Sequence, residues 1–384
     1  MPRAVILSHS VFLCPYIRGR TSQLSLISAT IAMQYCCIYG GMPGSLMIEP
    51  DGMYLLGKGE QLTMDITILL GLQNFRDGIG SCLADFMAKM TFLGEIPTAF
   101  VIMAVIYWCI SKDFGTYLMM GWSGNRLVNG FLKVTACAYR PWIRDARIVP
   151  YGNAMTTATG YSFPSGHTMN AASVFGGVTV RKDMPAVLRA VMFVVVILTA
   201  FSRNYLGVHT PQDTLVGLAA GMLVMWLTCK LMKWVESHPE KDVWVFCIGI
   251  GLAVIVALYA ALKPYPVDLD ADGNVLVEGA KMANDTFKGI GWCCAFLTGW
   301  ILERRFIRFT TDIPMIKRMT RLVTGVLSYY AVSLILVPLV KGWIPGPAGT
   351  FISCFLQMFY VAFLFPWFIK KLEKPEERAG IAKA

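Results

Sequence analysis

Residues 243–262 read VWVFCIGIGLAVIVALYAAL, a run with no charged side chain. At about 1.5 Å per residue, a helix of this length crosses the roughly 30 Å hydrocarbon core of a bilayer. Because lipid offers the backbone no hydrogen-bond partners, such runs fold as helices. The expected fold is therefore all-α, a polytopic transmembrane helical bundle. We predict spans at 91–111, 115–138, 166–182, 185–206, 212–234, 243–262, 286–303, 320–340 and 349–370.

The composition supports a membrane protein and argues against several soluble classes. Of the 384 residues, 55% are hydrophobic and only 15% are charged, below the soluble average of about 25% charged residues. The net charge of +10 does not indicate a nucleic-acid partner, because the basic residues lie at the ends of apolar runs. The 11 cysteines include no CxxC pair, so we expect neither a zinc site nor a disulfide framework.

The loop charges predict the orientation. Lysine and arginine are concentrated in alternate loops, above all in 304–321, and in the C-terminal tail. By the positive-inside rule these segments face the cytoplasm. The opposite loops include the acidic stretch Asp268, Asp270 and Asp272 and are expected to face outward. We therefore expect an integral protein of a bacterial inner membrane with a cytoplasmic C-terminus.

The N-terminal part differs from the rest in its pattern. Residues 64–90 mix apolar and charged residues at helical spacing, which predicts an amphipathic interfacial helix. Residues 1–63 are only moderately apolar and form an uncertain extension. The codons of Lys58-Gly59-Glu60 are compatible with a purine-rich ribosome-binding sequence, so we expect translation to begin at Met64.

Three polar stretches supply the side chains needed to hold and transfer a phosphate. They read KVTACAYRP at 133–141, PSGH at 164–167, and Ser202-Arg203 followed by His209 and Asp213. Lys133 and Arg140 are two helical turns apart, which predicts one shared face at the outer end of the second span, before Pro141 stops the helix. There they can converge on one anion, although a lysine at a span end also snorkels to the interface.

The PSGH stretch precedes an apolar helix. Ser165 is expected to cap the N-terminus of this helix, where free backbone N–H groups bind anions. Gly166 allows a phosphate oxygen to approach the backbone closely, and His167 in the first turn can protonate a leaving oxygen. An ordinary helix cap would explain Ser165 equally well, but it would not explain His167.

His209 and Asp213 are four residues apart, and Pro211 indicates a turn between them. The carboxylate can fix the tautomer of the imidazole and leave its other nitrogen as a nucleophile. Arg203, at the end of the fourth span, offers a planar fork for phosphate. A surface His–Asp pair beside an interfacial arginine is the alternative. The occurrence of all three stretches on one side of the membrane favours a phosphate site.

In this order the stretches resemble the KxxxxxxRP, PSGH and SRxxxxxHxxxD signature of the type-2 phosphatidic acid phosphatases, whose superfamily includes glucose-6-phosphatase and the vanadium haloperoxidases. The resemblance covers 91–234, the phosphatase core, and leaves 235–384 as additional transmembrane helices and a tail. It implies that His209 forms a phosphohistidine, that Asp213 orients it, and that His167 is the general acid. It implies no metal or other cofactor. The phosphoryl oxygens would be held by Lys133, Arg140, Ser165, Gly166 and Arg203.

The function expected from these features is hydrolysis of a lipid or isoprenoid phosphate at the outer membrane face. Undecaprenyl diphosphate, phosphatidylglycerophosphate, phosphatidic acid and a sphingoid phosphate all fit, with the lipid chain remaining in the bilayer. One alternative is a phosphotransferase that passes the phosphoryl group to a lipid or sugar acceptor. Another is a non-catalytic membrane scaffold or transporter. The oligomeric state does not follow from the sequence.

Overall fold

A computed structural model describes residues 46–49, 52–55 and 64–372 of the chain. The chain divides between Thr63 and Met64 into two units. In the first unit, β1 (Leu46–Glu49) and β2 (Gly52–Leu55) pair as an antiparallel hairpin. The rest of the predicted extension at 1–63 lies outside the described residues, and translation from Met64 stays a prediction.

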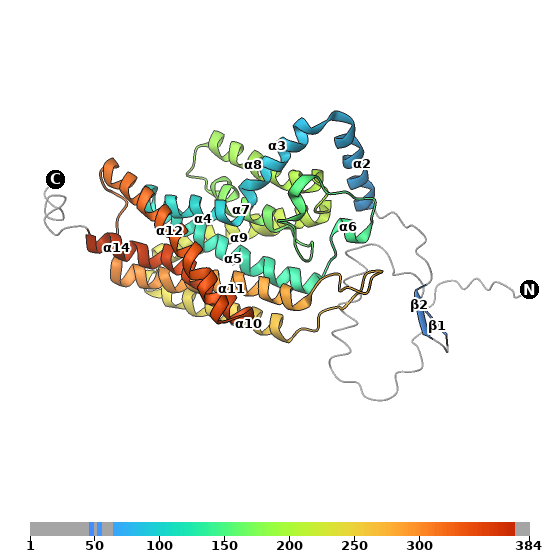
Figure 1. Ribbon diagram of the computed structural model, residues 1–384. Helices are drawn as coiled ribbons and strands as arrows, with labels where there is room; N and C mark the ends of the chain where they lie inside the picture. The colour runs from blue at the N-terminus through green and yellow to red at the C-terminus, as the bar shows by residue number, and fades with distance from the viewer. Residues whose placement is uncertain (1–45, 50–51, 56–63, 373–384) are drawn as a thin grey trace, which may run out of the picture. The chain divides into compact units, whose positions relative to one another are not determined.

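The second unit is built of helices, as the sequence predicts (Figure 1). Its long helices are α2 (Met64–Ile79), α3 (Ser81–Thr91), α4 (Ile96–Val105), α5 (Lys112–Ala136), α7 (Gly166–Val180), α8 (Ala186–Tyr205), α9 (Pro211–Ser237), α10 (Asp242–Leu262), α11 (Gly279–Leu302), α12 (Met315–Trp343) and α13 (Gly346–Phe359). Shorter helical segments are η1 (Phe92–Gly94), η2 (Ile106–Ile110), α6 (Pro141–Arg144), η3 (Gly152–Met155), η4 (Pro239–Lys241), η5 (Glu303–Ile307), η6 (Tyr360–Leu364) and α14 (Phe365–Leu372).

The predicted spans from 115 onward each coincide with a helical stretch, although α11 begins at Gly279 rather than at 286. The predicted span 91–111 is instead broken at Glu95, between η1 and α4. Within residues 64–372, 5 helices are long and apolar enough to cross a membrane, or up to 6 if the pair of helices bent by 55° at Glu95 forms one span. The helices α5, α7 and α11 are not among them. α7 has only 15 residues, and the other two carry polar residues that line the cavity described below. A total of nine spans therefore stays a prediction.

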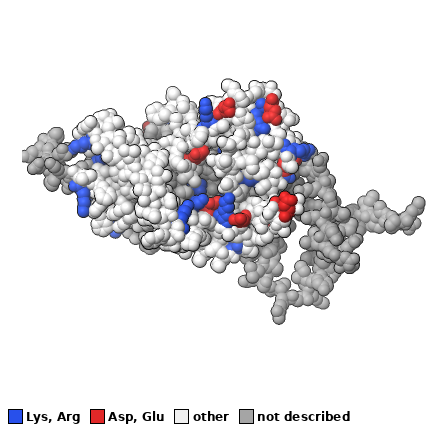
Figure 2. All heavy atoms as spheres, in the orientation of Figure 1, with Lys and Arg blue, Asp and Glu red and all other residues white. Residues whose placement is uncertain are grey.

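On the face shown in Figure 2, the surface of the helical unit between its α14 end and its middle is largely uncharged, and side chains of both charge signs gather near the middle. Basic side chains lie at the end where α14 is found, and mixed acidic and basic side chains lie toward α2 and α6. An apolar band bounded by charged ends is the surface that a bilayer requires. The protein is an integral membrane protein.

The predicted amphipathic helix at 64–90 is divided into α2 and α3. Gly80 separates them with a φ of 83°, a left-handed conformation that glycine adopts without strain. α2 is bound to the segment that follows α5, because Asp65 pairs with Arg144 at 2.6 Å and Arg76 donates to the Val149 carbonyl at 3.0 Å. The interfacial position of this region stays a prediction.

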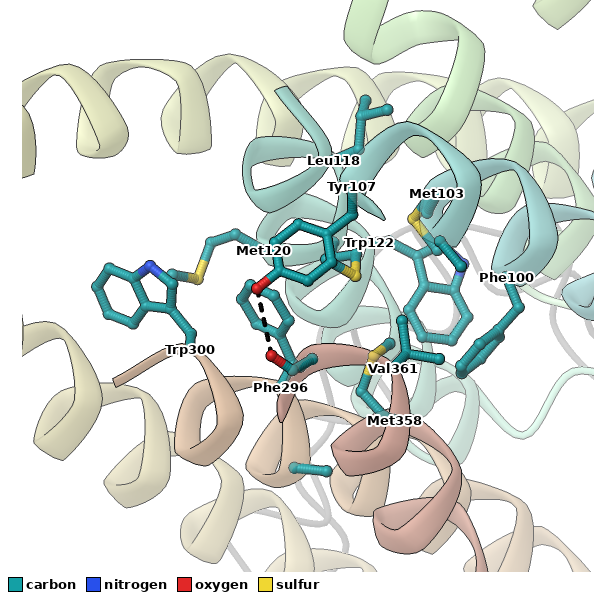
Figure 3. Close-up of a cluster of buried hydrophobic side chains, with 14 of the residues drawn as sticks. Phe100, Met103, Tyr107, Leu118, Met120, Trp122, Phe296, Trp300, Met358 and Val361 are labelled. Carbon is teal, nitrogen blue, oxygen red and sulfur yellow. Dashed lines mark hydrogen bonds between the residues drawn. The ribbon is translucent and has the colours of Figure 1, made fainter. Parts of the chain in front are cut away.

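The C-terminal helices share one hydrophobic core with the preceding helices. The Trp122 ring of α5 lies 5.0 Å from Phe100 of α4 and 5.2 Å from Trp292 of α11, measured between ring centroids. Tyr107 donates from its hydroxyl to the Ala362 carbonyl at 3.2 Å, the bond drawn in Figure 3. α5 packs against α7 and α9 as well as against α11, so α11 borders the region where the three polar stretches meet.

Candidate active site

The three polar stretches meet at one cavity of about 280 Å³. Most of the predicted site residues line it directly: Lys133, Arg140, Gly166, His167 and His209. The remaining ones are almost fully buried without lining it: Ser165, Arg203 and Asp213. Tertiary folding thus brings together residues from α5, the loop before α6, the start of α7, the end of α8 and the start of α9.

His209 lies in the short loop between α8 and α9, with only 1% of its side chain exposed. Its backbone is fixed on both sides, because its N–H donates to the Arg203 carbonyl (3.3 Å) and its carbonyl accepts from Asn204 Nδ2 (2.9 Å). Nδ1 lies 3.3 Å from Asp213 Oδ2, and Nε2 lies 2.9 Å from Arg140 Nη1. Arg140 Nη1 also lies 3.4 Å from Nδ1, so its shorter contact is the one to Nε2. Because arginine only donates and a carboxylate only accepts, these distances favour the tautomer with the proton on Nδ1 and the lone pair on Nε2.

Asp213 is positioned by the first turn of α9. Pro211 is the first residue of this helix, and Thr210 and Asp213 form a capping box. The Thr210 N–H donates to Asp213 Oδ2 at 2.8 Å, and the Asp213 N–H donates to Thr210 Oγ1 at 3.4 Å. Ser162 Oγ donates to the same Oδ2 at 2.5 Å. The turn expected between His209 and Asp213 is therefore the start of a helix.

The prediction that Lys133 and Arg140 share a helix face is wrong. α5 ends at Ala136, because Cys137 adopts a left-handed conformation with a φ of 48°. Arg140 follows in an extended segment, and Pro141 begins α6 rather than ending α5. Lys133 and Arg140 nevertheless line the same cavity, because the chain turns back over the end of α5.

Both cations are held by backbone carbonyls. Lys133 Nζ donates to the carbonyl of Tyr161 at 2.9 Å. The Arg140 guanidinium donates to the carbonyls of Thr159 (3.1 Å), Gly160 (3.0 Å) and Val208 (3.0 Å). These bonds fix the direction of the fork without neutralising its charge, so the charge remains available to an anion.

The start of α7 has the predicted cap. Ser165 Oγ accepts from the Thr168 N–H (3.4 Å) and from Thr168 Oγ1 (3.0 Å), so in this structure the hydroxyl serves its own helix. The Ser165 N–H donates to the Asp213 carbonyl at 2.9 Å, which joins the starts of α7 and α9. Gly166 and His167 face the cavity. Among the described residues, His167 Nε2 has no hydrogen-bond partner although it is buried.

Arg203 is fully buried, with 0% of its side chain exposed. Its Nη1 donates to Thr91 Oγ1, but within residues 64–372 its Nε and Nη2 atoms have no partner. Leaving a charged donor buried and unpaired costs free energy that a bound anion would recover. The unpaired Nε and Nη2 atoms of Arg203 and the unpaired Nε2 atom of His167 therefore both fit a phosphate ligand.

The electrostatic surroundings keep His209 neutral. Burial lowers its pKa, and the nearby cations Arg140, Arg203 and Lys133 lower it further, well below its usual range. A neutral imidazole at neutral pH retains the lone pair that a nucleophile needs.

Comparison with known families places this cavity in context. Residues 114–237 match the model of the PAP2 superfamily, and residues 287–378 match that of the PAP2 superfamily phosphatase, transmembrane extension. The chain belongs to the PAP2 superfamily. The predicted resemblance is thereby confirmed, and the C-terminal helices are a second recognised element rather than an unrelated addition.

Relatives within and beyond bacteria share part of the chain. Phosphatidylglycerophosphatase B of Bacillus subtilis is 29% identical over 171 residues, which is 41% of this chain and 80% of that protein. Glucose-6-phosphatase catalytic subunit 1 of Haplochromis nubilus is 25% identical over 203 residues, 46% of this chain and 56% of that protein. The crystal structure of a transmembrane PAP2 type phosphatidylglycerolphosphate phosphatase from Bacillus subtilis is 23% identical, with a TM-score of 0.39 over 54% of this chain and 96% of that one.

Several residues of the PAP2 cavity were not predicted from the sequence. Arg126 lies seven residues before Lys133 on α5, a spacing that could have indicated a shared helix face. Asp285 and Lys288 come from α11, outside the 114–237 match, and no sequence spacing connects them to the signature. Ser162, the hydrogen-bond partner of Asp213, lies in a loop with no helical register to reveal it.

Proposed function

We propose that this PAP2 superfamily member is a membrane phosphatase that hydrolyses a lipid or isoprenoid phosphate at the outer face of a bacterial inner membrane. The observation that carries the proposal is the imidazole of His209, which lies between Asp213 Oδ2 (3.3 Å) and Arg140 Nη1 (2.9 Å) at the cavity. An oriented neutral imidazole facing cations is the arrangement that nucleophilic attack on a phosphate requires. The name of one relative, phosphatidylglycerophosphatase B, supports the lipid class.

In the first step, Nε2 of His209 attacks phosphorus while the bond between phosphorus and the leaving oxygen breaks. His167, which the bound phosphate dianion holds in its protonated form, donates a proton to that oxygen, so that the lipid leaves as an alcohol or, from a diphosphate, as a monophosphate. Arg140 transfers its hydrogen bond from Nε2 to a phosphoryl oxygen. Lys133 and Arg203 stabilise the charge that develops on the other phosphoryl oxygens.

In the second step, water attacks the phosphohistidine and the bond between phosphorus and Nε2 breaks. His167, now neutral, takes the proton from the water, and inorganic phosphate is released. Asp213 stabilises the positive charge on the imidazole ring throughout the life of the phosphohistidine. The chain's own cations supply the charge stabilisation in both steps, so the proposed mechanism requires no metal ion.

Apolar side chains among the lining residues of the cavity support a substrate with a hydrocarbon chain. The cavity that His209 and Arg140 line is also lined by Ile96 and Pro97 at the start of α4 and by Met282 of α11. A lipid chain leaving the cavity along these side chains remains in an apolar environment, which avoids the cost of hydrating it.

A substrate panel tests the proposal. The purified chain in detergent micelles, without added metal, is expected to release inorganic phosphate from isoprenoid diphosphates, glycerophospholipid monophosphates or sphingoid phosphates faster than from soluble sugar phosphates. An added alcohol acceptor distinguishes hydrolysis from phosphotransfer, since transfer leaves phosphate on the acceptor. Failure to release phosphate from every member of the panel would overturn the enzyme assignment.

The lowered pKa of His209 predicts its chemical reactivity. Diethyl pyrocarbonate modifies neutral imidazole, so modification of His209 is expected to persist to a lower pH than in a histidine peptide, whose pKa is about 6.5. The direction follows because Arg140, Arg203 and Lys133 disfavour the protonated ring. Site-resolved mass spectrometry measures the fraction of His209 that is modified between about pH 4.5 and 8, a range of roughly one to two pKa units on either side of the usual histidine value. The pH at which half of His209 is modified is the midpoint. A midpoint at or above that of the peptide would contradict the prediction.

A further inference from the structure

The cavity contains two cations that the signature does not include. Arg126 comes from α5, and Lys288 comes from α11. Lys288 lies within the transmembrane extension at 287–378 rather than in the PAP2 match at 114–237. The extension therefore contributes one charged side chain to the cavity where His209 lies.

Arg126 lies beside Gly166, the first residue of α7. Its Nη1 is 3.8 Å from the position that a Cβ atom on Gly166 would occupy. Its guanidinium carbon lies 5.5 Å from the centroid of the Trp292 ring, which packs against it from α11. Among the described residues, the buried Arg126 Nε has no hydrogen-bond partner. A guanidinium with an unpaired donor at this point is able to bind an oxygen anion next to the one that Gly166 approaches.

The position of Lys288 relative to Arg126 is set by close backbone packing. A Cβ on Gly289 of α11 would lie only 2.9 Å from the Arg126 carbonyl oxygen, so glycine permits α11 to approach α5. One turn away, a Cβ on Gly130 would lie 3.0 Å from Thr286 Cγ2. Lys288 Nζ is paired with Asp285 Oδ1 at 2.6 Å, which leaves the group formed by Arg126, Lys288 and Asp285 with one net positive charge.

The number of cations exceeds what one phosphate needs. Lys133, Arg140 and Arg203 already outweigh the charge of about −2 on a phosphate monoester. We propose that Arg126 and Lys288 form a second anion subsite, which binds a non-scissile phosphate group of the substrate. Such a group occurs in an isoprenoid diphosphate and in a glycerophosphate headgroup joined to lipid through a phosphodiester. This inference rests on the proposed phosphatase function.

The depth of the subsite agrees with the chemistry of such substrates. Arg126 lies near the middle of α5 (Lys112–Ala136), and Lys133 lies in its last turn. In both kinds of substrate the non-scissile phosphate lies between the scissile phosphate and the apolar chain. A chain that remains in the bilayer therefore places this second phosphate on the Arg126 side of His209.

The test compares substrates with one and two phosphates in mixed detergent micelles. We define a discrimination ratio as kcat/KM for farnesyl diphosphate, or for phosphatidylglycerophosphate, divided by kcat/KM for phosphatidic acid. Arg126→Gln and Lys288→Gln are each expected to lower this ratio about tenfold, equivalent to about 1.4 kcal/mol. Arg126→Lys keeps the charge and is expected to recover part of the loss. Lys281→Gln removes an exposed charge from the same helix without touching the cavity, and its ratio is expected to equal that of the wild type.

The outcomes separate this inference from the proposed function. A fall in only one of the two ratios identifies whether the second phosphate belongs to a diphosphate or to a phosphodiester headgroup. Wild-type ratios in both glutamine variants would overturn the subsite, as would an equal fall in Lys281→Gln. A wild-type protein that hydrolyses phosphatidic acid but neither two-phosphate substrate would also overturn it, while leaving the phosphatase function intact. Should Arg126→Gln fail to fold, the discrimination ratios of Lys288→Gln and Arg126→Lys are compared with that of the wild type instead.

Discussion

His209→Ala is expected to lower kcat for phosphate release by about 10⁴-fold or more, since removal of a nucleophile that forms a covalent intermediate typically costs 10⁴–10⁶-fold. In the proposed mechanism the imidazole accepts the phosphoryl group, and neither Asp213 nor Arg140 offers a ring nitrogen that could replace its Nε2. The loop should keep its conformation, because the backbone of residue 209 is held by the Arg203 carbonyl and by Asn204 Nδ2.

Two measurements check this result. Initial rates of phosphate release give the loss of activity, and acid-labile labelling from a ³²P-labelled substrate detects the phosphohistidine in the wild type alone. His238→Ala is the matched control, because this partly exposed histidine just after α9 does not line the cavity and its removal should leave the rate unchanged. A His209→Ala protein that elutes as the wild type does on size exclusion, yet retains turnover, would refute the role of His209.

Arg140→Lys is expected to lower kcat by about 10²-fold, the typical cost of removing one preorganised donor to a developing charge. The positive charge is kept, but the planar fork is lost. A lysine cannot at once satisfy the carbonyls of Thr159, Gly160 and Val208 and donate to the phosphoryl group near His209 Nε2.

The control for this prediction is Arg144→Lys on α6. Arg144 pairs with Asp65 at 2.6 Å and does not line the cavity, so the same exchange there should leave kcat near the wild-type value. Single-turnover kinetics distinguishes a slower phosphoryl transfer from a weaker substrate affinity. Equal kcat values for Arg140→Lys and the wild type would show that charge alone suffices at residue 140.

Most of the helical segments were predictable because their signal is local. The run at 243–262 is apolar over its whole length, and α10 occupies it almost residue for residue (Asp242–Leu262). An apolar run did not predict the full extent of a helix that packs with one face and presents polar residues on another. α11 extends back to Gly279, and the residues added there include the cavity residues Met282 and Asp285.

The positions of the functional residues were predictable only where a short motif carries them. The residues of the Ser165 cap and of the His209–Asp213 contact are no more than four positions apart in the sequence, so local geometry decides them. The prediction that Lys133 and Arg140 share a helix face was wrong because one residue in a left-handed conformation, Cys137, ends α5 between them. Hydrophobic periodicity does not predict such a conformation, since cysteine rarely adopts it.

By itself, then, the sequence determined that this protein is a membrane helical bundle and that three of its stretches carry the groups for phosphoryl transfer. These properties depend on apolar length and on side-chain chemistry, and both are read along the chain. Only the tertiary structure decided that Arg126, Ser162 and Lys288 join these stretches at the cavity or behind it. Such neighbours arise from packing between distant segments: α11 approaches α5 because Gly289 has no side chain to hold them apart.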